Sequence, residues 1–261
     1  MVVVWAGLIG GVIGSFLNVV IYRFPAGMSL VRPASACPTC HTAIAGRDNI
    51  PVLSWVLLRG RCRTCREPIS RRYPAVELLT AVLFVAVALH FGTLSADGWA
   101  IGPFWVLAAL GVALSGIDLD TQRLPDPIVG FGYVAGGVAL LAASLAGAGD
   151  GMDALGRAAL GAAGLFSFYL AAWFAYPAGM GFGDVKLAGL LGMFLAWAGW
   201  GTLAVGALAA FVVGVGAVIV LALVGRARRG IPFGPAMFAG AALGIAFGQP
   251  LWAKYLQVMG L

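Results

Sequence analysis

Charged side chains are scarce in this sequence. Of its 261 residues, 16 are Lys or Arg and 10 are Asp or Glu, so that charged residues make up only 10% of the chain while hydrophobic residues make up 61%. Soluble domains carry about 25% charged residues, which they need to cover a folded surface. The composition excludes an ordinary soluble enzyme and predicts an integral membrane protein.

Long apolar runs account for most of the chain. A helix of roughly 17 to 25 apolar residues can cross the hydrocarbon core because it satisfies its own backbone hydrogen bonds there. The runs predict an all-α fold of about eight transmembrane helices, near residues 2–22, 75–92, 101–117, 128–146, 155–176, 185–200, 202–224 and 236–258. The third and sixth runs are short, so we expect their polar ends to lie inside the protein or at its water line.

The features of a secretory signal are missing from the first run. No basic residue precedes it and no small-x-small cleavage pattern follows it. Both features are typical of signal peptides. The run ends instead at Arg23, and we interpret it as a membrane helix.

Basic residues are distributed unevenly between the predicted loops. The side that holds residues 23–74 carries 14 of the 16 Lys and Arg, and the opposite side keeps only Arg157 and Lys254. Because basic loops stay in the cytoplasm, residues 23–74 are predicted to be cytoplasmic and both termini to lie outside. The net charge of +6 then reflects the orientation of the chain in the membrane and is not evidence for nucleic-acid binding. Contact with anionic lipid headgroups is the alternative interpretation.

Cysteine is also rare, and all of it lies in the polar insert formed by residues 23–74. Two C-x-x-C pairs, Cys37/Cys40 and Cys62/Cys65, are separated by 21 residues, which is close to the spacing of a zinc site with four thiolates. Two disulfides or idle thiols are the alternatives, but disulfides are rare in the cytoplasm. Because so small an insert buries little core, we predict a structural zinc ion with no chemistry at the metal.

With only ten acidic residues in the chain, each can be considered. Five lie in predicted loops, where solvation explains them, and Glu77 could pair with Arg72 or close a helix cap. Two motifs remain: GIDLDTQRLPD at 116–126, between the third and fourth spans, and GFGDVK at 181–186, between the fifth and sixth. Counting crossings places both motifs on the cytoplasmic side, so their carboxylates can meet. Two carboxyls that share a proton can activate water and polarise a peptide carbonyl, as in aspartic proteases.

The aspartates of these motifs also have structural interpretations. Asp126, which precedes a proline, is typical of the N-cap of the fourth span, and Asp184 could be only the N-cap of the sixth. Asp118 and Asp120 lie two residues apart at a helix end, so they point in different directions. If Asp118 and Asp184 pair, the helix dipoles favour the proton on Asp118 and the charge on Asp184. Lys186 is interpreted as an anchor at the lipid headgroups.

Several stretches together resemble the bacterial prepilin peptidases of the type IV leader peptidase family. They are GSFLNVVIYRFP at 14–25, the paired cysteines with SRRYPAVELLTA at 70–81, DLDTQRLPD at 118–126, GMGFGDVKLAGLLG at 179–192 and IPFGPAMFAG at 231–240. The resemblance implies an aspartic protease of the bacterial cytoplasmic (inner) membrane that removes the short basic leader from type IV prepilins or pseudopilins at the cytoplasmic face. It places the catalytic role on Asp118 and Asp184, with Asp120 as second choice.

The resemblance also implies a second activity, methylation of the new N-terminal residue by S-adenosylmethionine. The cysteine-bearing insert is similar to that of the bifunctional family members. The implied organisation is a first membrane helix (1–22), a zinc-binding insert associated with methylation (23–74) and a seven-helix peptidase domain (75–261). No glycine-rich nucleotide loop follows a strand, so no residue is assigned to the methyl donor. The implied partners are prepilin or pseudopilin substrates and membrane lipid, without nucleic acid; no oligomeric state is assigned.

Two other functions are weighed against this one. A cation-coupled transporter would need polar residues deep in several spans, but apart from Asn18 and scattered Ser and Thr the middles of the spans are apolar or glycine, and no inverted repeat is found. A general intramembrane G-x-G-D protease would cut within a transmembrane helix of its substrate and not at its start. The mass of the product therefore distinguishes the two proteases.

Overall fold

The structure is a computed structural model that describes residues 1–94, 97–177, 179–225 and 232–260. Its α-helices are α1 (Val2–Arg23), α2 (Leu53–Leu57), α3 (Arg72–Leu89), α4 (Ile101–Thr121), α5 (Asp126–Leu145), α6 (Met152–Ala175), α7 (Phe182–Ala198), α8 (Trp200–Leu223) and α9 (Gly234–Met259). In the described ranges there is no β-strand longer than an isolated bridge. The predicted all-α class is confirmed.

Seven of the described helices, namely α1, α3, α4, α5, α6, α8 and α9, are long and apolar enough to cross a membrane. The remaining predicted span is α7, which has only 17 residues. The third span is not short, because its helical segment covers 24 residues, Gly98–Thr121. The sequence placed its end at the first polar residue, but α4 continues until Gln122, which adopts the left-handed conformation. Asp118 therefore lies inside the last turn of α4.

The chain divides into two compact units, Met1–Leu94 and Ser95–Leu261. In the first unit, α1 packs along α3, and the insert is joined to this helix pair by Glu77. The Glu77 Oε2 atom accepts a hydrogen bond of 2.7 Å from the backbone N–H of Val52, the N-cap residue of α2. Glu77, which lies in α3, thus caps the N-terminus of α2 and not that of its own helix. The functional division at residue 74 stays a prediction.

Helix α7 is surrounded by other helices in the second unit. It contacts α5, α6, α8 and α9, and its buried residues are Val185, Leu187, Ala188, Gly189, Leu190, Leu191, Gly192, Phe194, Leu195, Ala196 and Trp197. A helix that is apolar on all faces and enclosed by protein does not need the length of a helix that faces lipid. This explains why α7 is short.

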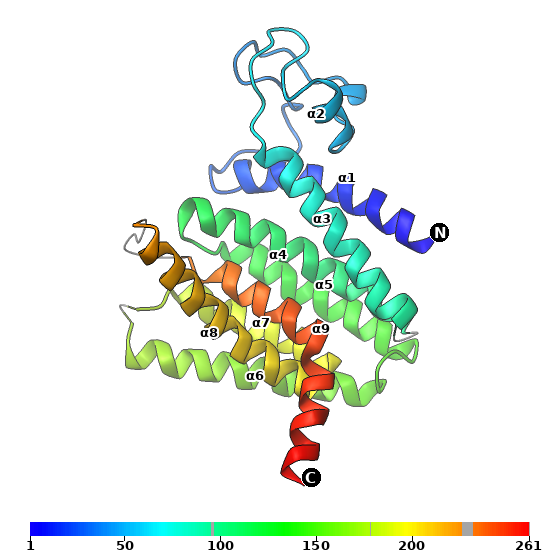
Figure 1. Ribbon diagram of the computed structural model, residues 1–261, viewed down its shortest axis with the longest axis vertical. Helices are drawn as coiled ribbons and strands as arrows, with labels where there is room; N and C mark the ends of the chain where they lie inside the picture. The colour runs from blue at the N-terminus through cyan, green and yellow to red at the C-terminus, as the bar shows by residue number, and fades with distance from the viewer. Residues whose placement is uncertain (95–96, 178, 226–231, 261) are drawn as a thin grey trace. The chain divides into compact units, whose positions relative to one another are not determined.

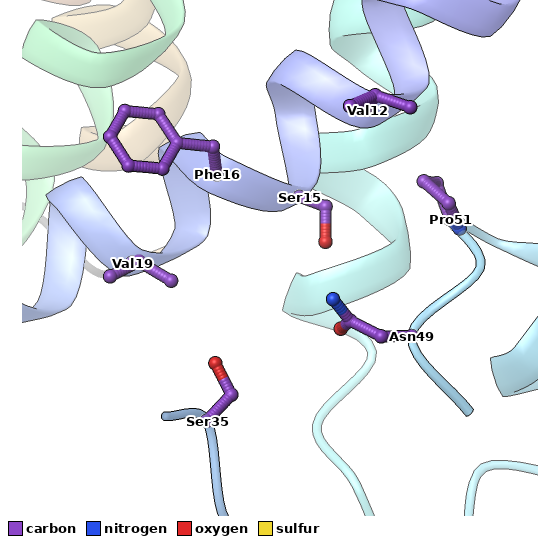
Figure 2. Close-up of a pocket in the computed structure, with 7 residues that line it drawn as sticks. All are labelled: Val12, Ser15, Phe16, Val19, Ser35, Asn49 and Pro51. Atoms are coloured by element: carbon purple, nitrogen blue, oxygen red, sulfur yellow. The ribbon is translucent and has the colours of Figure 1, made fainter. Parts of the chain in front are cut away.

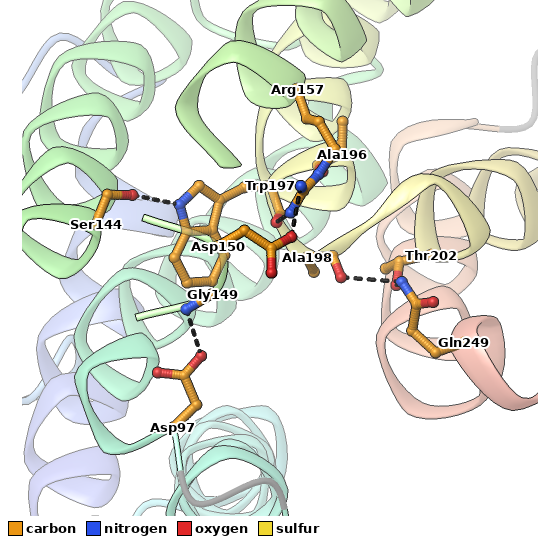
Figure 3. A network of polar contacts seen from close by, with 10 residues as sticks. All are labelled: Asp97, Ser144, Gly149, Asp150, Arg157, Ala196, Trp197, Ala198, Thr202 and Gln249. Atoms are coloured by element: carbon orange, nitrogen blue, oxygen red, sulfur yellow. Dashed lines mark hydrogen bonds and ion pairs between the residues drawn. The ribbon is translucent and has the colours of Figure 1, made fainter. Parts of the chain in front are cut away.

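Side chains from other helices satisfy the C-terminal end of α7 (Figure 3). The last carbonyls of a helix have no partner within the helix. The Arg157 guanidinium donates to the carbonyl of Trp197 at 3.2 Å and to that of Ala196 at 3.4 Å, and the Gln249 amide donates to that of Ala198 at 3.0 Å. A helix that ends inside a membrane protein has no water to satisfy these carbonyls, and the side-chain hydrogen bonds satisfy them instead.

The same network fixes the neighbouring loops. The Trp197 indole N–H donates to the Ser144 hydroxyl at 2.9 Å, and Arg157 forms an ion pair with Asp150 at 2.6 Å. The Asp97 carboxylate accepts the backbone N–H of Gly149 at 2.9 Å. One end of α7 is thereby held by polar contacts from α5, α6 and α9.

Candidate active site

The helix ends that carry the two aspartate motifs meet at the opposite end of α7. The backbone N–H of Gly234, at the start of α9, donates to Oδ2 of Asp118 in the last turn of α4 at 3.0 Å. At the starts of α7 and α5, Lys186 forms an ion pair of 2.6 Å with Asp126. The two predicted motifs therefore lie at one end of the second unit, as counting crossings predicted.

Asp118 is buried, and its environment requires glycine at position 234. A Cβ atom at this position would lie 2.7 Å from Asp118 Oδ2, closer than real Cβ atoms approach other atoms. Only glycine lets the N–H reach the carboxylate without displacing it. The sequence singled out the stretch IPFGPAMFAG but not this role of Gly234. The feature of the sequence that could have indicated this helix start is a glycine followed by a proline at the beginning of an apolar run.

Asp184 is the third residue of α7 and not its N-cap. The N-cap is Gly181, and the Asp184 carboxylate faces the backbone N–H of Gly181, so Asp184 supports this helix end from the third position of the helix and not from the N-cap. Asp184 is half-buried, and its Oδ2 lies 3.6 Å from the position of a Cβ at residue 181. Gly181 is exposed, and its backbone N–H faces the Asp184 carboxylate as a donor.

The segments that hold the two aspartates lie against each other. Leu124 packs between the segments that hold them. The Leu124 Cβ lies 3.0 Å from the point where a Cβ would stand on Gly183, and the Leu124 Cδ2 lies 3.4 Å from the equivalent point on Gly234. The structure thus brings Asp118 and Asp184 together around one leucine of the first motif.

Asp120 differs from Asp118 in its surroundings. Asp118 is buried while Asp120 is exposed, as expected for residues two apart on a helix. Each carboxylate of the pair has a backbone donor at the positive end of a helix: Asp118 has the N–H of Gly234 at the start of α9, and Asp184 has the N–H of Gly181 at the start of α7. The expected division of charge within the pair stays a prediction.

An aromatic cluster of Tyr169, Phe211 and Phe233 lies beside these residues. The Tyr169 ring stacks on that of Phe211 with centroids 5.7 Å apart, and Phe233 contacts both rings at 6.4 and 5.8 Å. Phe233 directly precedes Gly234, and Tyr169 interacts electrostatically with Asp184. The cluster joins α6 and α8 to the start of α9, so it helps to fix the donor to Asp118. Sequence reasoning did not find it.

The four cysteines of the insert form the second candidate site. Their Sγ atoms all lie within 4.8 Å of one another, and none is in a disulfide. The Cys37–Cys65 and Cys40–Cys62 sulfur distances are 3.7 and 4.0 Å. A tetrahedral zinc ion with bonds of about 2.3 Å would hold its sulfurs about 3.8 Å apart. The cluster therefore fits a metal with four thiolate ligands, and the two-disulfide alternative does not match this structure.

Neighbouring groups support both halves of this cluster. The Thr42 hydroxyl lies 3.4 Å from Cys40 Sγ, and hydrogen bonds from Thr42 lower the pKa of the Cys40 thiol to about 6. A thiolate is the form that binds a metal. Arg63, next to Cys62, forms a bidentate ion pair with Asp48, 2.6 Å at its shortest. The guanidinium holds the pKa of the Asp48 carboxyl below its usual range.

A groove of about 260 Å³ lies between α1 and the insert within the first unit (Figure 2). It is lined by Val12, Ser15, Phe16, Val19, Ser35, Asn49 and Pro51. The polar groups facing it are two hydroxyls and one amide. None of these lining residues is charged.

Both units of the chain match known protein families. Residues 8–91 match the bacterial peptidase A24 N-terminal domain, and residues 105–253 match the type IV leader peptidase family. The chain is similar to proteins named prepilin leader peptidase/N-methyltransferase. The chain is 35% identical to the protein of Stutzerimonas stutzeri, and the match covers 98% of this chain and 94% of the relative. It is 38% identical to the protein of Aeromonas hydrophila, and that match covers 94% of this chain and 90% of the relative. No solved structure gives a significant match.

Proposed function

The chain belongs to the type IV leader peptidase family, and we propose that it removes the leader from prepilin-type substrates and methylates the new N-terminus. One observation carries the peptidase part: Leu124 packs against Gly183, next to Asp184, and against Gly234, whose N–H donates to Asp118, so the two motifs meet at one place. The methyltransferase part rests on the names of relatives that match nearly the whole chain. The transporter alternative has no comparable support.

The paired carboxyls suit peptide hydrolysis when one is ionised and the other is protonated. The ionised carboxylate takes a proton from water as the water oxygen attacks the carbonyl carbon of the scissile peptide bond. The protonated carboxyl donates its proton to the carbonyl oxygen. When the tetrahedral intermediate collapses, the C–N bond breaks, the proton taken from water passes to the leaving nitrogen, and the former carbonyl oxygen returns its proton to the second carboxylate. The products are a leader with a free carboxylate and a mature chain with a free amino group.

The proposed location is the bacterial cytoplasmic membrane, with the aspartates at the cytoplasmic face. A multi-pass membrane protein is supported by seven apolar helices of sufficient length and by the family. The cytoplasmic orientation rests on the uneven distribution of Lys and Arg. A prepilin presents a basic leader followed by an apolar helix, so its cleavage site would lie at the level of these helix ends, with lipid around its apolar helix.

We propose zinc as the metal of the four-cysteine cluster. Cys37, Cys40, Cys62 and Cys65 would hold it, and four thiolates leave no open position for substrate, so its role is structural. The groove between α1 and the insert has no charged lining residue to pair with the carboxylate or ammonium group of S-adenosylmethionine, the methyl donor of the proposed reaction. We assign no residue to the donor.

The test is cleavage of a prepilin by the purified chain in detergent, with S-adenosylmethionine present. We expect Asp118→Asn and Asp184→Asn each to lower the cleavage rate by about 100-fold or more, since each removes a group that transfers a proton. Asp120→Asn is the matched control and should cleave normally. The Tm of each variant in detergent, compared with that of the parent, reports whether the variant is folded.

Each contrary result has a definite meaning. If Asp118→Asn cleaves normally and Asp120→Asn does not, the pair is wrongly assigned. If the product mass shows cleavage within the apolar segment of the substrate, the chain is a general intramembrane protease.

A further inference from the structure

We propose that Asp126, Tyr133 and Lys186 form a seam between α5 and α7 that positions Asp184 against Asp118. The seam acts through the two helices and does not touch the reacting atoms, so its members are positioning residues. This inference rests on the proposed peptidase function and adds residues to which neither motif assigned such a role.

The seam consists of two polar contacts between the helices. Lys186 Nζ lies 2.6 Å from Asp126 Oδ2, and the Tyr133 hydroxyl donates to the backbone carbonyl of Lys186 at 2.9 Å. The Lys186 ammonium also lies 5.0 Å above the ring of Phe182, the first residue of α7. Lys186 is therefore held by its side chain and by its main chain.

The interpretation of Asp126 as an N-cap is wrong. Asp126 is the first residue of α5, its N-cap is Pro125, and no side chain caps this helix end. Lys186 pairs with Asp126 across two helices, and its side chain is 31% exposed, so its ammonium has a partner within the protein. Its role as a headgroup anchor stays a prediction.

The seam lies where it controls the geometry of the pair. Lys186 follows Asp184 by two residues, and Asp126 follows Asp118 by eight, across the turn that contains Leu124. The ion pair between Asp126 and Lys186 therefore links the short segment that follows Asp118 to the short segment that follows Asp184. The bond from Tyr133 lies about two helical turns further along α5 than Asp126, so the two contacts together resist rotation of α7 as well as sliding.

Small rotations matter at this site. A side chain on a helix reaches about 5–6 Å from the axis, so a rotation of α7 by about 10° would move the Asp184 carboxylate by about 1 Å. Misplacement by about 1 Å can lower a rate by about 100-fold. An exposed ion pair adds little to stability, and Asp126 is 66% exposed. We infer that the value of this pair lies in geometry.

The chain offers a matched control at the other end of the same unit. Arg157 and Asp150 form an ion pair of the same length, 2.6 Å, and Asp150 is 68% exposed. Asp150 has no contact with either motif among the hydrogen bonds and ion pairs of the described residues. Asp126→Asn and Asp150→Asn therefore remove equivalent carboxylates, one from the seam and one from elsewhere.

The experiment measures kcat and KM for prepilin cleavage by Asp126→Asn, Lys186→Met, Lys186→Arg, Tyr133→Phe and Asp150→Asn. We expect Asp126→Asn and Lys186→Met to lower kcat by about 10- to 100-fold at unchanged KM. Lys186→Arg, which keeps the ion pair, should recover most of kcat. Tyr133→Phe should lower kcat by less, since it leaves the ion pair in place, and Asp150→Asn should match the parent.

Methyl transfer to a peptide that begins at the mature N-terminus is measured on the same preparations, and it should be unchanged in every variant. The proposal is overturned if Asp126→Asn and Asp150→Asn have equal kcat, or if Lys186→Met raises KM and leaves kcat unchanged, which would make Lys186 a substrate-binding residue. If Lys186→Met fails to fold, the comparison of Asp126→Asn with Asp150→Asn still decides. A parent chain that does not cleave prepilin contradicts the proposed function instead.

Discussion

At the scale of single residues, the candidate site depends on an atom that Gly234 lacks. The buried Asp118 carboxylate obtains its backbone donor from a residue 116 positions later in the chain. Such a donor can approach only where no Cβ intervenes. A carboxylate held in this way is both oriented and stabilised in its charged form.

Replacing Gly234 with alanine should therefore impair cleavage. The added Cβ would lie 2.7 Å from Asp118 Oδ2, so either the carboxylate or the start of α9 must shift. We expect kcat to fall by about 10-fold or more, as measured in the prepilin cleavage assay. Gly216→Ala in α8 is the control, because a Cβ there meets nothing within 4 Å. Equal rates for the two variants would contradict the role given to Gly234.

The residue scale also shows what spacing in the sequence predicts and what it does not. The sequence indicated that two aspartate motifs would meet and that four cysteines would form a metal site, because loop order and C-x-x-C spacing are local patterns. It did not predict that Glu77 caps α2, that Lys186 pairs with Asp126 or that Gly234 contacts Asp118. Each of these depends on a partner from another helix, and an apolar pattern does not identify which helices are neighbours.

At the scale of secondary-structure elements, α7 was predictable as a short apolar run but not as an enclosed helix. Its apolar residues surround the whole helix, which in a membrane protein is compatible with facing lipid or protein. The deciding feature is the contact with α6. There, Gly161 and Gly192 bring the two backbones together, and a Cβ at Gly161 would lie 2.6 Å from the carbonyl oxygen of Gly192. Small residues at helix crossings are the usual basis of close packing in membranes.

Gly161→Ala should separate α6 from α7 and destabilise the second unit. Gly164→Ala on the same helix is the matched control, since a Cβ there meets nothing within 4 Å. We expect Gly161→Ala to lower the free energy of unfolding by about 1–3 kcal/mol, the usual cost of overpacking, and to lower the Tm in detergent. Gly164→Ala should be neutral or slightly stabilising, because alanine favours helix more than glycine does. If both variants melt alike, the close α6–α7 contact does not limit stability.

At the scale of the whole molecule, two compact units correspond to two matched families. The unit boundary at Leu94 and Ser95 lies between the family matches, which cover residues 8–91 and 105–253. The sequence predicted a functional boundary at residue 74, where the polar insert ends, because composition changes there. Packing between α1 and α3 places the structural boundary one helix later, since α3 is the partner that covers α1.

Removing the metal should therefore unfold the insert and leave the second unit folded. Between α1 and α3 the described insert contains one short α-helix, a 3-10 turn and two isolated bridges, so its order depends on the four thiolates, with support from the Asp48–Arg63 pair and the Glu77 cap. A metal that contributes on the order of 10 kcal/mol to such a module cannot be removed without loss of structure. The second unit has its own buried core around α7 and no cysteine. It has no reason to depend on the ion.

The measurement is hydrogen exchange by mass spectrometry on the detergent-solubilised chain, with and without a strong chelator, and with zinc content determined in parallel. Loss of zinc should remove protection from peptides between Cys37 and Cys65 and leave α7 unchanged. A Cys62→Ser/Cys65→Ser variant should show the same pattern without chelator, because two thiolates cannot complete a tetrahedral site. Loss of protection that extends into α7 would show that the units fold together, and full protection of a zinc-free insert would show that the metal is not structural.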